Sequence, residues 1–382
     1  MKKPLIIIDN KIPFIKGVLE SVAEVNYVEG SQIDSSIVRN ADAIITRTRT
    51  KCNAALLEGS SVRFIATATI GTDHIDTHYC DTHGIAWTNA AGCNSGSVYQ
   101  YIAAVFAWMV RHQGAELEKL TLGVVGCGHV GSKIVRLGKL LGMNVLANDP
   151  PLQRTVGGDF VALDEVVSKA DIVTLHTPLT RDGNDPTFHL ISKHELEKMK
   201  PGALLINSSR GEVVDGDALL EALKTNKTGG AVLDVWEHEP AISSELLAKT
   251  MLATPHIAGY SADGKAIGTM MSIQSVSRFF NFPLQEWRPD GLPSPVQSTD
   301  IELDANNKSV NQLFADAVLH TYPIEEDDRR LRANTQQFEE LRGNYPVRRE
   351  FPAYSLHLLN ASAETEQLFQ KLGFNLSLYI NK

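Results

Sequence analysis

The chain has 382 residues, more than the roughly 250–300 at which one hydrophobic core usually stops growing, so we expect two or three domains. Hydrophobic residues make up 43% and charged residues 21% of the sequence, a balance that excludes an extensively disordered chain. The net charge of -9 disfavours a general nucleic-acid-binding surface, although it leaves room for a local basic pocket that binds a small anion.

The N-terminus and the cysteines indicate the compartment. The apolar run at residues 5–8 ends at Asp9 and is too short for a signal peptide or a membrane span. The cysteines form no C-x-x-C pair, so neither a disulfide framework nor a thiolate zinc site is predicted. They are Cys52, Cys80, Cys93 and Cys127. We therefore expect a cytoplasmic protein with reduced thiols and no membrane association.

In the first hundred residues, short apolar runs alternate with polar stretches of helix length. Strands are predicted at residues 5–8, 43–46 and 63–66, which is an α/β pattern. An apolar helix is predicted at residues 97–112, and it leads directly into the next strand. This helix is expected to connect two domains.

The segment from residue 120 to about residue 255 repeats the alternation of strands and helices. Its predicted strands lie at residues 122–125, 144–147, 172–176, 203–207 and 230–234. Parallel strands need crossover connections, which usually carry helices, so the pattern favours a doubly wound parallel sheet covered on both faces. Ligands of such sheets bind at the carboxyl ends of the strands.

The last third of the chain begins with a predicted helix at residues 261–280, which returns the chain toward the first domain. A proline-rich linker follows, and a strand, a helix and a strand are predicted at residues 354–359, 364–372 and 375–380. This pattern indicates a small α+β C-terminal domain. The domains expected are residues 1–98 together with 257–285, residues 99–256, and residues 286–382.

A glycine-rich turn, G-C-G-H-V-G, follows the predicted strand at residues 122–125 and precedes a predicted helix. Gly126 makes the turn, Gly128 lets the backbone approach a pyrophosphate, and Gly131 lets the helix pack closely on the strand. The helix N-terminus offers unpaired N–H groups and a positive dipole end to phosphates. Strand, turn and helix in this order predict a Rossmann-like dinucleotide site.

Asp149 ends the next predicted strand, 23 positions beyond Gly126. This spacing is close to that of a carboxylate which binds the adenosine ribose hydroxyls. A 2′-phosphate would meet the negative charge of Asp149, and the nearest arginine is Arg154. The sequence therefore predicts NAD rather than NADP.

Three further segments follow predicted strands: N-S-S-R-G with Arg210, D-V-W-E-H-E-P with Glu239, and P-H-I-A-G with His256. Oxidising a secondary alcohol needs a base for the hydroxyl proton, a hydride acceptor, and a fixed cation for the carboxylate and the developing carbonyl oxygen. These residues meet that need. Chemistry alone leaves open whether Glu237 or Glu239 is the partner of His256.

These motifs stand in the order found in the D-isomer-specific 2-hydroxyacid dehydrogenase family, which the chain resembles over about residues 1–280. The resemblance implies that His256 is the general base and that Glu239, immediately before the proline, pairs with it and makes it a better proton acceptor. It also implies that Arg210 clamps the substrate carboxylate and polarises the reacting oxygen.

The chain is more closely similar to one branch of this family. The segments that carry this similarity are A-T-A-T-I-G-T-D-H at residues 66–74, A-G-C-N at 91–94, H-I-A-G-Y at 256–260 and an additional C-terminal region. This resemblance implies substrate contacts from Thr48, Thr69 and Tyr260. T-R-T at residues 48–50 departs from the serine-containing R-S-x-T of the branch. The residues expected to hold NAD are Gly126, Gly128, His129, Val130, Gly131, Asp149, Thr177, Ser208, Ser209, Arg210, Asp234 and Gly259.

The resemblance also gives the domains roles. Residues 1–98 with 257–285 are expected to form a flavodoxin-like substrate (lid) domain, residues 99–256 a Rossmann-like NAD-binding domain, and residues 286–382 a dimerisation domain. A homodimer acting on a small phosphorylated 2-hydroxy acid is therefore expected. Candidates for binding the phosphate are Arg47, Arg49, Arg348 and Arg349, because a guanidinium makes paired hydrogen bonds to phosphate oxygens. For the last two, a solvated basic pair is the alternative.

Other interpretations remain. His74 and His78 have the i, i+4 spacing of metal ligands, but hydride transfer needs no metal and G-T-D-H-I-D resembles a structural turn of the family, so no metal is expected. Another D-2-hydroxyacid dehydrogenase, such as a phosphoglycerate dehydrogenase, is an alternative, because only the substrate pocket distinguishes these enzymes. A non-catalytic, NAD-sensing corepressor-like protein is disfavoured by the joint presence of Arg210, Glu239 and His256.

Overall fold

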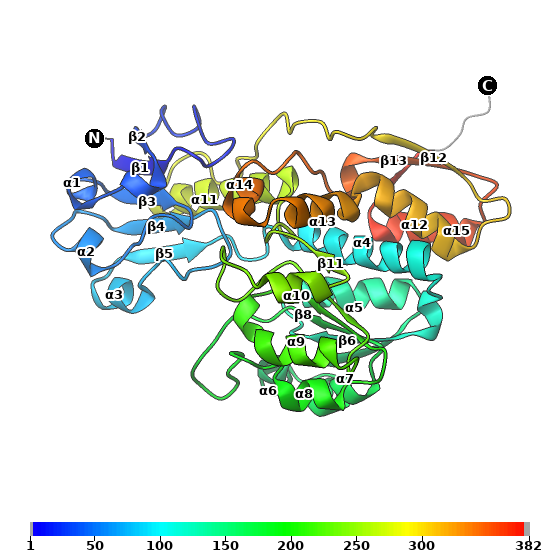
Figure 1. The fold of residues 1–382 in the computed structure, drawn as a ribbon. Coiled ribbons are helices and arrows are strands. Elements are labelled where there is room, and N and C mark those ends of the chain that lie inside the picture. Colours follow the sequence, from blue (N-terminus) through cyan, green and yellow to red (C-terminus); the bar gives the residue numbers. More distant parts are fainter. Residues whose placement is uncertain (1–2, 378–382) are drawn as a thin grey trace, which may run out of the picture. The chain divides into compact units, whose positions relative to one another are not determined.

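The structure is a computed structural model that describes residues 3–377, and the chain divides into two compact units. The first unit comprises the chain up to Asn94 together with Ser261–Pro293. The second comprises Ser95–Tyr260 and the residues from Ser294 onward (Figure 1). Within residues 3–377, no helix is long and apolar enough to cross a membrane.

The first unit is built around a five-stranded sheet in the order β2-β1-β3-β4-β5, in which every neighbouring pair is parallel. This is the flavodoxin-like order expected from the sequence. The strands are β1 (Leu5–Asp9), β2 (Glu24–Val28), β3 (Ala43–Thr46), β4 (Phe64–Thr67) and β5 (Ala86–Asn89).

Both faces of this sheet are covered, because side chains of a strand alternate between its two faces. Ile6 and Ile8 share a buried cluster with Ile273 and Val276 of the long helix α11 (Ala262–Phe280). Ile7 belongs to a second cluster on the opposite face. Three short helices contribute to that second cluster, namely α1 (Ser35–Val38), α2 (Ala54–Leu57) and α3 (Thr77–Thr82).

A six-stranded parallel sheet in the order β11-β10-β9-β8-β6-β7 forms the centre of the second unit. Its strands are β6 (Thr121–Val125), β7 (Asn144–Asn148), β8 (Ile172–Leu175), β9 (Leu204–Asn207), β10 (Gly230–Leu233) and β11 (Leu252–Ala253). Its helices are α4 (Ser95–Gln113), α5 (Gly131–Leu140), α6 (Pro150–Val156), α7 (Leu163–Lys169), α8 (Lys193–Lys198), α9 (Gly216–Lys224) and α10 (Ser244–Lys249). The chain passes from β6 to β7 and then crosses back to β8, so the strand order reverses beside β6. Ligands bind at such reversal points.

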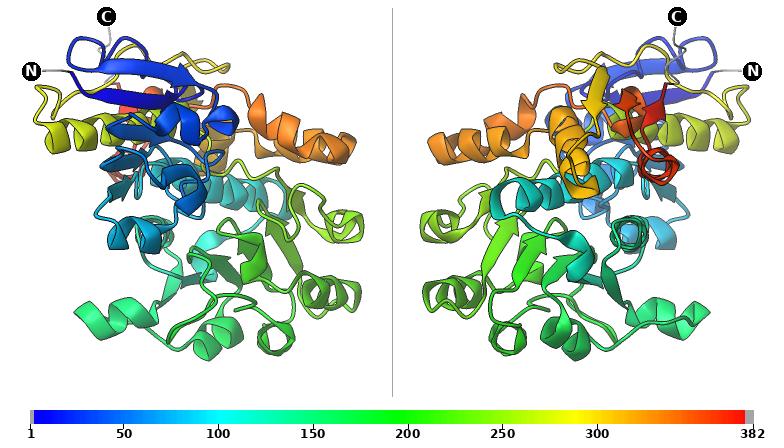
Figure 2. Two further views of the ribbon diagram at one scale, coloured as in Figure 1. Left: turned by 90° about the vertical axis from the view of Figure 1, so that its left-hand side faces the viewer. Right: turned by 90° about the vertical axis from the view of Figure 1, so that its right-hand side faces the viewer.

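The C-terminal region adds a parallel three-stranded sheet of β12 (Asp300–Asp304), β13 (Ser355–Leu359) and β14 (Asn375–Leu376). Its helices are α12 (Val310–Thr321), α13 (Ile324–Ala333), α14 (Phe338–Gly343) and α15 (Ala363–Leu372). Helix α12 packs along α4 (Figure 2). Tyr101 and Phe106 of α4 share one buried core with Phe314 and Tyr354 of the C-terminal region. This region therefore shares a core with the six-stranded sheet.

The predicted fold class is confirmed, and the two long helices predicted at residues 97–112 and 261–280 correspond to α4 and α11. The sequence pattern does not predict β2, β5, β11 or β12. All four are edge strands: β2, β5 and β12 have mixed exposure, and β11 has only two residues. The strand predicted at residues 375–380 begins as β14, and its positions after 377 lie outside the described residues.

Candidate active site

The glycine turn joins β6 to α5 at the carboxyl end of the six-stranded sheet. Gly126 has a φ of 84°, a left-handed conformation that residues with side chains rarely adopt. A Cβ atom on Gly131 would collide with the carbonyl oxygen of Gly126. A Cβ atom on Gly128 would meet no heavy atom within 4 Å, so space remains for a ligand to approach the backbone. His129 is exposed and Val130, directly before α5, is partly buried.

Asp149 follows β7 beside this turn. Its Oδ2 accepts a hydrogen bond from the Cys127 N–H at 2.8 Å, and its Oδ1 accepts one from the Leu152 N–H at 2.9 Å, which caps α6. Each carboxylate oxygen has two lone pairs, so ribose hydroxyls can still donate to it. Asp149 thus fixes the turn while keeping a negative charge beside it.

Two buried hydroxyls at this sheet edge, Oγ1 of Thr177 after β8 and Oγ of Ser208 after β9, have no hydrogen-bond partner among the described residues. A buried, unpaired hydroxyl costs about 1–3 kcal/mol, so it usually marks a place for a ligand or water. Ser209, in contrast, donates to Oδ1 of Asn207 at 2.8 Å. Burial lowers the pKa of His176, next to Thr177, to about 3. The glycine turn and the two hydroxyls fit a dinucleotide such as NAD.

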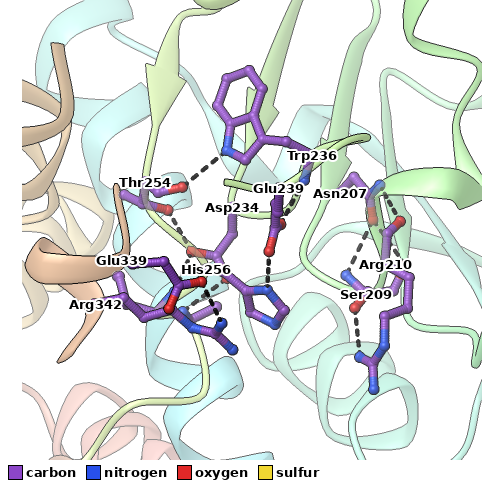
Figure 3. A network of polar contacts seen from close by, with 12 residues as sticks. Asn207, Ser209, Arg210, Asp234, Trp236, Glu239, Thr254, His256, Glu339 and Arg342 are labelled. Atoms are coloured by element: carbon purple, nitrogen blue, oxygen red, sulfur yellow. Dashed lines mark hydrogen bonds and ion pairs between the residues drawn. The ribbon is translucent and has the colours of Figure 1, made fainter. Parts of the chain in front are cut away.

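His256 and Glu239 point toward each other in Figure 3, with Nδ1 of the histidine 2.7 Å from Oε2 of the glutamate. Oε1 of Glu239 accepts the Trp236 N–H at 2.9 Å, which fixes the carboxylate. Glu237 instead lies 2.8 Å from Nε2 of His189. The geometry therefore pairs His256 with Glu239, and it leaves Nε2 of His256 as the ring nitrogen that can face a substrate hydroxyl.

The loop after β11 turns sharply at His256, whose φ is 56°. A histidine in this left-handed region is strained, and the strain persists only where surrounding contacts hold it. Asp234 supplies several of these contacts: its carbonyl oxygen accepts the His256 N–H at 2.7 Å. Its carboxylate accepts the N–H groups of Ile257 and Ala258 at 2.8 and 2.9 Å. Thr254 Oγ1 also donates to this carboxylate, at 2.6 Å.

Arg210 follows β9, and its Nη1 donates to the carbonyl oxygen of Ser209 at 2.8 Å. A Cβ atom on the next residue, Gly211, would collide with the Trp236 carbonyl, so the close approach of the two loops requires glycine there. Arg210, Glu239 and His256 thus follow the adjacent strands β9, β10 and β11, and Figure 3 shows them at one edge of the sheet.

Two of the expected substrate residues lie in the first unit. Thr48 is exposed in the loop after β3, and Oγ1 of Thr69 lies 2.7 Å from Oγ1 of Thr67. Arg47 donates to a backbone carbonyl at 3.2 Å, and Arg49 is exposed. These threonines and arginines therefore follow β3 and β4 at the carboxyl end of the five-stranded sheet.

Tyr260, the third expected substrate residue, lies in the second unit after the partly buried Gly259. Its ring packs edge-on against Tyr345 at 6.2 Å between centroids, and the guanidinium of Arg342 in α14 lies 5.6 Å from the Tyr260 centroid. Arg349 is partly buried. Arg342 was not predicted as a site residue, because nothing in the sequence around α14 marks it as close to Tyr260.

Arg348 is not a solvated surface residue, since only 4% of it is exposed. Its Nη2 donates to the carbonyl oxygens of Ile257 and Ala258, at 3.1 and 2.6 Å. Burial acts to lower the pKa of Arg348, but the surrounding groups, which include Tyr345 and Asp327, raise it above its ordinary value. The guanidinium therefore stays charged beneath the His256 loop.

Within the described part of the chain, no group of three or more histidine, cysteine, aspartate or glutamate side chains could hold a metal ion. Nε2 of His74 lies 3.1 Å from Oγ1 of Thr67, and His78 lies on α3. Cys52, Cys80, Cys93 and Cys127 form no disulfide bond among the described residues.

Known proteins resemble this chain over nearly its whole length. Residues 98–258 match the D-isomer specific 2-hydroxyacid dehydrogenase, NAD binding domain, and residues 292–373 match a domain of unknown function (DUF3410). The chain is 45% identical over 357 residues to erythronate-4-phosphate dehydrogenase of Bacteroides fragilis, which covers 92% of this chain and 98% of the relative. The enzyme of that name from Pseudomonas fluorescens is 38% identical over 375 residues, and the match covers 97% of this chain and 99% of the relative.

Solved structures show the same fold. D-lactate dehydrogenase from Aquifex aeolicus, complexed with NAD and lactic acid, superimposes with a TM-score of 0.58 at 26% identity, covering 74% of this chain and 97% of that one. The holo form of Rhodotorula graminis D-mandelate dehydrogenase gives a TM-score of 0.62 at 23% identity, covering 73% of this chain and 95% of that one. At this identity the likeness shows the fold alone.

Proposed function

Because the chain belongs to the erythronate-4-phosphate dehydrogenase family, we propose that it oxidises C2 of 4-phospho-D-erythronate with NAD, forming 2-oxo-3-hydroxy-4-phosphobutanoate. The observation that carries this proposal is the His256–Glu239 pair, 2.7 Å apart, at the sheet edge that also carries Arg210 and the glycine turn. We place the reaction in the biosynthesis of pyridoxal 5′-phosphate (vitamin B6), and the chain in the cytoplasm.

The proposed chemistry divides between cofactor and protein. NAD, when bound, accepts the hydride that leaves C2. Nε2 of His256 takes the proton of the C2 hydroxyl, whose O–H electron pair becomes the second C–O bond. Glu239 holds the imidazole in place and stabilises its protonated form. Arg210 clamps the substrate carboxylate and polarises the developing carbonyl oxygen.

NAD would be held by residues on the loops that follow β6, β7, β8 and β9. The open space at Gly128 suits a pyrophosphate, and the Asp149 carboxylate suits the ribose hydroxyls. The hydroxyls of Thr177 and Ser208 are buried and need partners, which a polar cofactor supplies. The remaining contacts are assigned, on the family resemblance, to Gly126, His129, Val130, Gly131, Ser209, Arg210, Asp234 and Gly259.

The substrate contacts are assigned in the same way to Thr48, Thr69 and Tyr260. The buried Arg348 donates to two backbone carbonyls, so it is not proposed to bind the substrate phosphate. Arg47, Arg49 and Arg349 remain candidates.

We keep the three functional regions predicted from the sequence: a substrate domain (residues 1–98 and 257–285), an NAD-binding domain (99–256) and a dimerisation domain (286–382). The family resemblance places a subunit contact in the last region, and symmetric homodimers are the commonest oligomers. Deleting residues 294–382 would also uncover the buried face of α4, so we expect an insoluble product or a monomer. A soluble truncated dimer would rule out this role.

The proposed activity is tested by following NADH absorbance while the protein and NAD are mixed with a panel of 2-hydroxy acids. We expect 4-phospho-D-erythronate to give the highest kcat/KM. A higher value with 3-phosphoglycerate would assign a different substrate. Tight NAD binding without turnover of any acid would instead favour an NAD-sensing protein.

A further inference from the structure

We propose that Arg348 is a positioning residue, contributed by the C-terminal region, that holds the His256 loop in its working conformation. The inference rests on the proposed role of His256. Ile257 and Ala258 directly follow that histidine, and Nη2 of Arg348 donates to both of their carbonyl oxygens, at 3.1 and 2.6 Å. The guanidinium thus contacts the backbone within two residues of the base.

The loop is held from two sides. Asp234 accepts the N–H groups of Ile257 and Ala258, and Arg348 donates to the carbonyl groups of the same two residues. Because His256 has a left-handed φ of 56°, its backbone needs this support to keep its conformation. Asp234 and Arg348 together therefore hold the backbone that carries the imidazole, and Glu239 orients the ring.

Arg348 is itself fixed in place. Its guanidinium lies 4.4 Å from the ring centroid of Tyr322 and 5.7 Å from that of Tyr345. Both tyrosine hydroxyls donate to Oδ2 of the buried Asp327, at 2.9 and 2.7 Å. The aromatic faces and the nearby carboxylate stabilise the buried cation, so it forms a rigid support for the loop.

The hydrogen bonding of Arg348 argues against a role in stability alone. Its Nε and Nη1 atoms are buried and have no hydrogen-bond partner among the described residues. Burying a cation with unpaired N–H groups is costly, and well-packed apolar side chains often stabilise a core better. The two hydrogen bonds that Arg348 does make both go to the His256 loop.

Replacing Arg348 should therefore lower the turnover number, kcat. A displacement of about 1 Å in a reacting group can cost about 100-fold in rate. We expect Arg348→Met to lower kcat by about that factor and to weaken NAD binding much less, because the glycine turn and Asp149 are not touched and only Asp234 and Gly259, among the residues assigned to NAD, lie near the loop. Arg348→Lys should fall in between, since an ammonium can donate to both carbonyls from a shorter side chain.

The experiment uses the full chain and compares these variants with Arg329→Met, which removes an exposed arginine of α13. For each, kcat, KM and NADH binding are measured, together with the oligomeric state. The control should match the unmodified protein. A wild-type kcat in Arg348→Met, or a loss of similar size in Arg329→Met, would overturn the inference.

A double-mutant cycle separates positioning from general damage. If Arg348 acts through His256, Arg348→Met should lower the residual turnover of His256→Ala very little. An equal loss in both backgrounds would contradict positioning. Wild-type turnover in His256→Ala would defeat the proposed function itself, which is a different outcome. Should Arg348→Met fail to fold, the cycle is run with Arg348→Lys, which keeps the charge.

Discussion

Oε2 of Glu239 lies 2.7 Å from Nδ1 of His256, while Oε1 of the same carboxylate accepts the Trp236 N–H at 2.9 Å. Glu239→Gln keeps an acceptor for Trp236 but removes the charge that stabilises a protonated imidazole. We expect kcat to fall by about 10²–10⁴-fold, with unchanged NADH binding. The matched control is Glu237→Gln, since Glu237 pairs with His189. Equal losses of kcat in the two variants would contradict the assignment.

The unpaired hydroxyls of Thr177 and Ser208 lead to a second prediction. Thr177→Val and Ser208→Ala should each weaken NAD binding by about 2–10-fold, the value of one hydrogen bond, without lowering the free energy of unfolding. Thr228 offers a control, because its hydroxyl is also buried and unpaired but lies before β10, at the amino end of the strand. The affinity for NAD is measured by calorimetric titration, and Thr228→Val should leave it unchanged. A loss of affinity in Thr228→Val as large as that in Thr177→Val or Ser208→Ala would refute the assignment.

The third prediction concerns cofactor choice. Asp149→Ser should narrow the preference for NAD over NADP, because the negative charge that repels a 2′-phosphate is lost. Serine is about as good a helix N-cap as aspartate, so the start of α6 should be little affected. The ratio of kcat/KM for the two cofactors is the measurement. Equal use of NAD and NADP by the unmodified protein would be incompatible with this argument.

His176 should make the stability depend on pH. Its pKa is lowered by burial to about 3 in the folded protein, whereas in the unfolded chain it is about 6.5. Between these values the unfolded chain binds more protons, so the free energy of unfolding decreases as the pH falls, by at most about 1.4 kcal/mol per pH unit. Urea unfolding at pH 7 and at pH 5 measures this change. Between these two pH values, the free energy of unfolding should decrease less for His176→Gln than for the unmodified protein. An identical decrease would mean that this histidine is charged when folded.

Much of the fold and of the arrangement of the candidate site could be predicted because most of its motifs follow buried apolar strands. Gly126 follows β6, Arg210 follows β9 and Glu239 follows β10, so a parallel sheet brings their loops to one edge. His256 follows β11, which has only two residues and was not predicted, so its place depended on the family resemblance. Chemistry alone left the choice between Glu237 and Glu239 open; the family resemblance implied Glu239, and in the structure Glu239 is the one that meets His256. The two lie on one loop, and only its backbone path determines which carboxylate meets the histidine.

The contact of Arg348 with the His256 loop could not be predicted from hydrophobic periodicity. It joins residues 91 and 90 positions apart, and it depends on how the C-terminal region packs on α4. Even where periodicity identifies the buried face of a helix, it does not identify which element covers that face. The proximity of Arg342 to Tyr260 depends on the same packing.

The identity of the substrate is the central claim, and the most direct measurement compares kcat/KM for 4-phospho-D-erythronate and unphosphorylated D-erythronate at saturating NAD. We expect the phosphorylated acid to be strongly preferred, because a guanidinium binds a phosphate through paired, charge-assisted hydrogen bonds. Replacing a phosphate-binding arginine with alanine, among Arg47, Arg49 and Arg349, should raise KM for the phosphorylated acid and change that of erythronate little. An unmodified enzyme that oxidised both acids with equal kcat/KM would contradict the account.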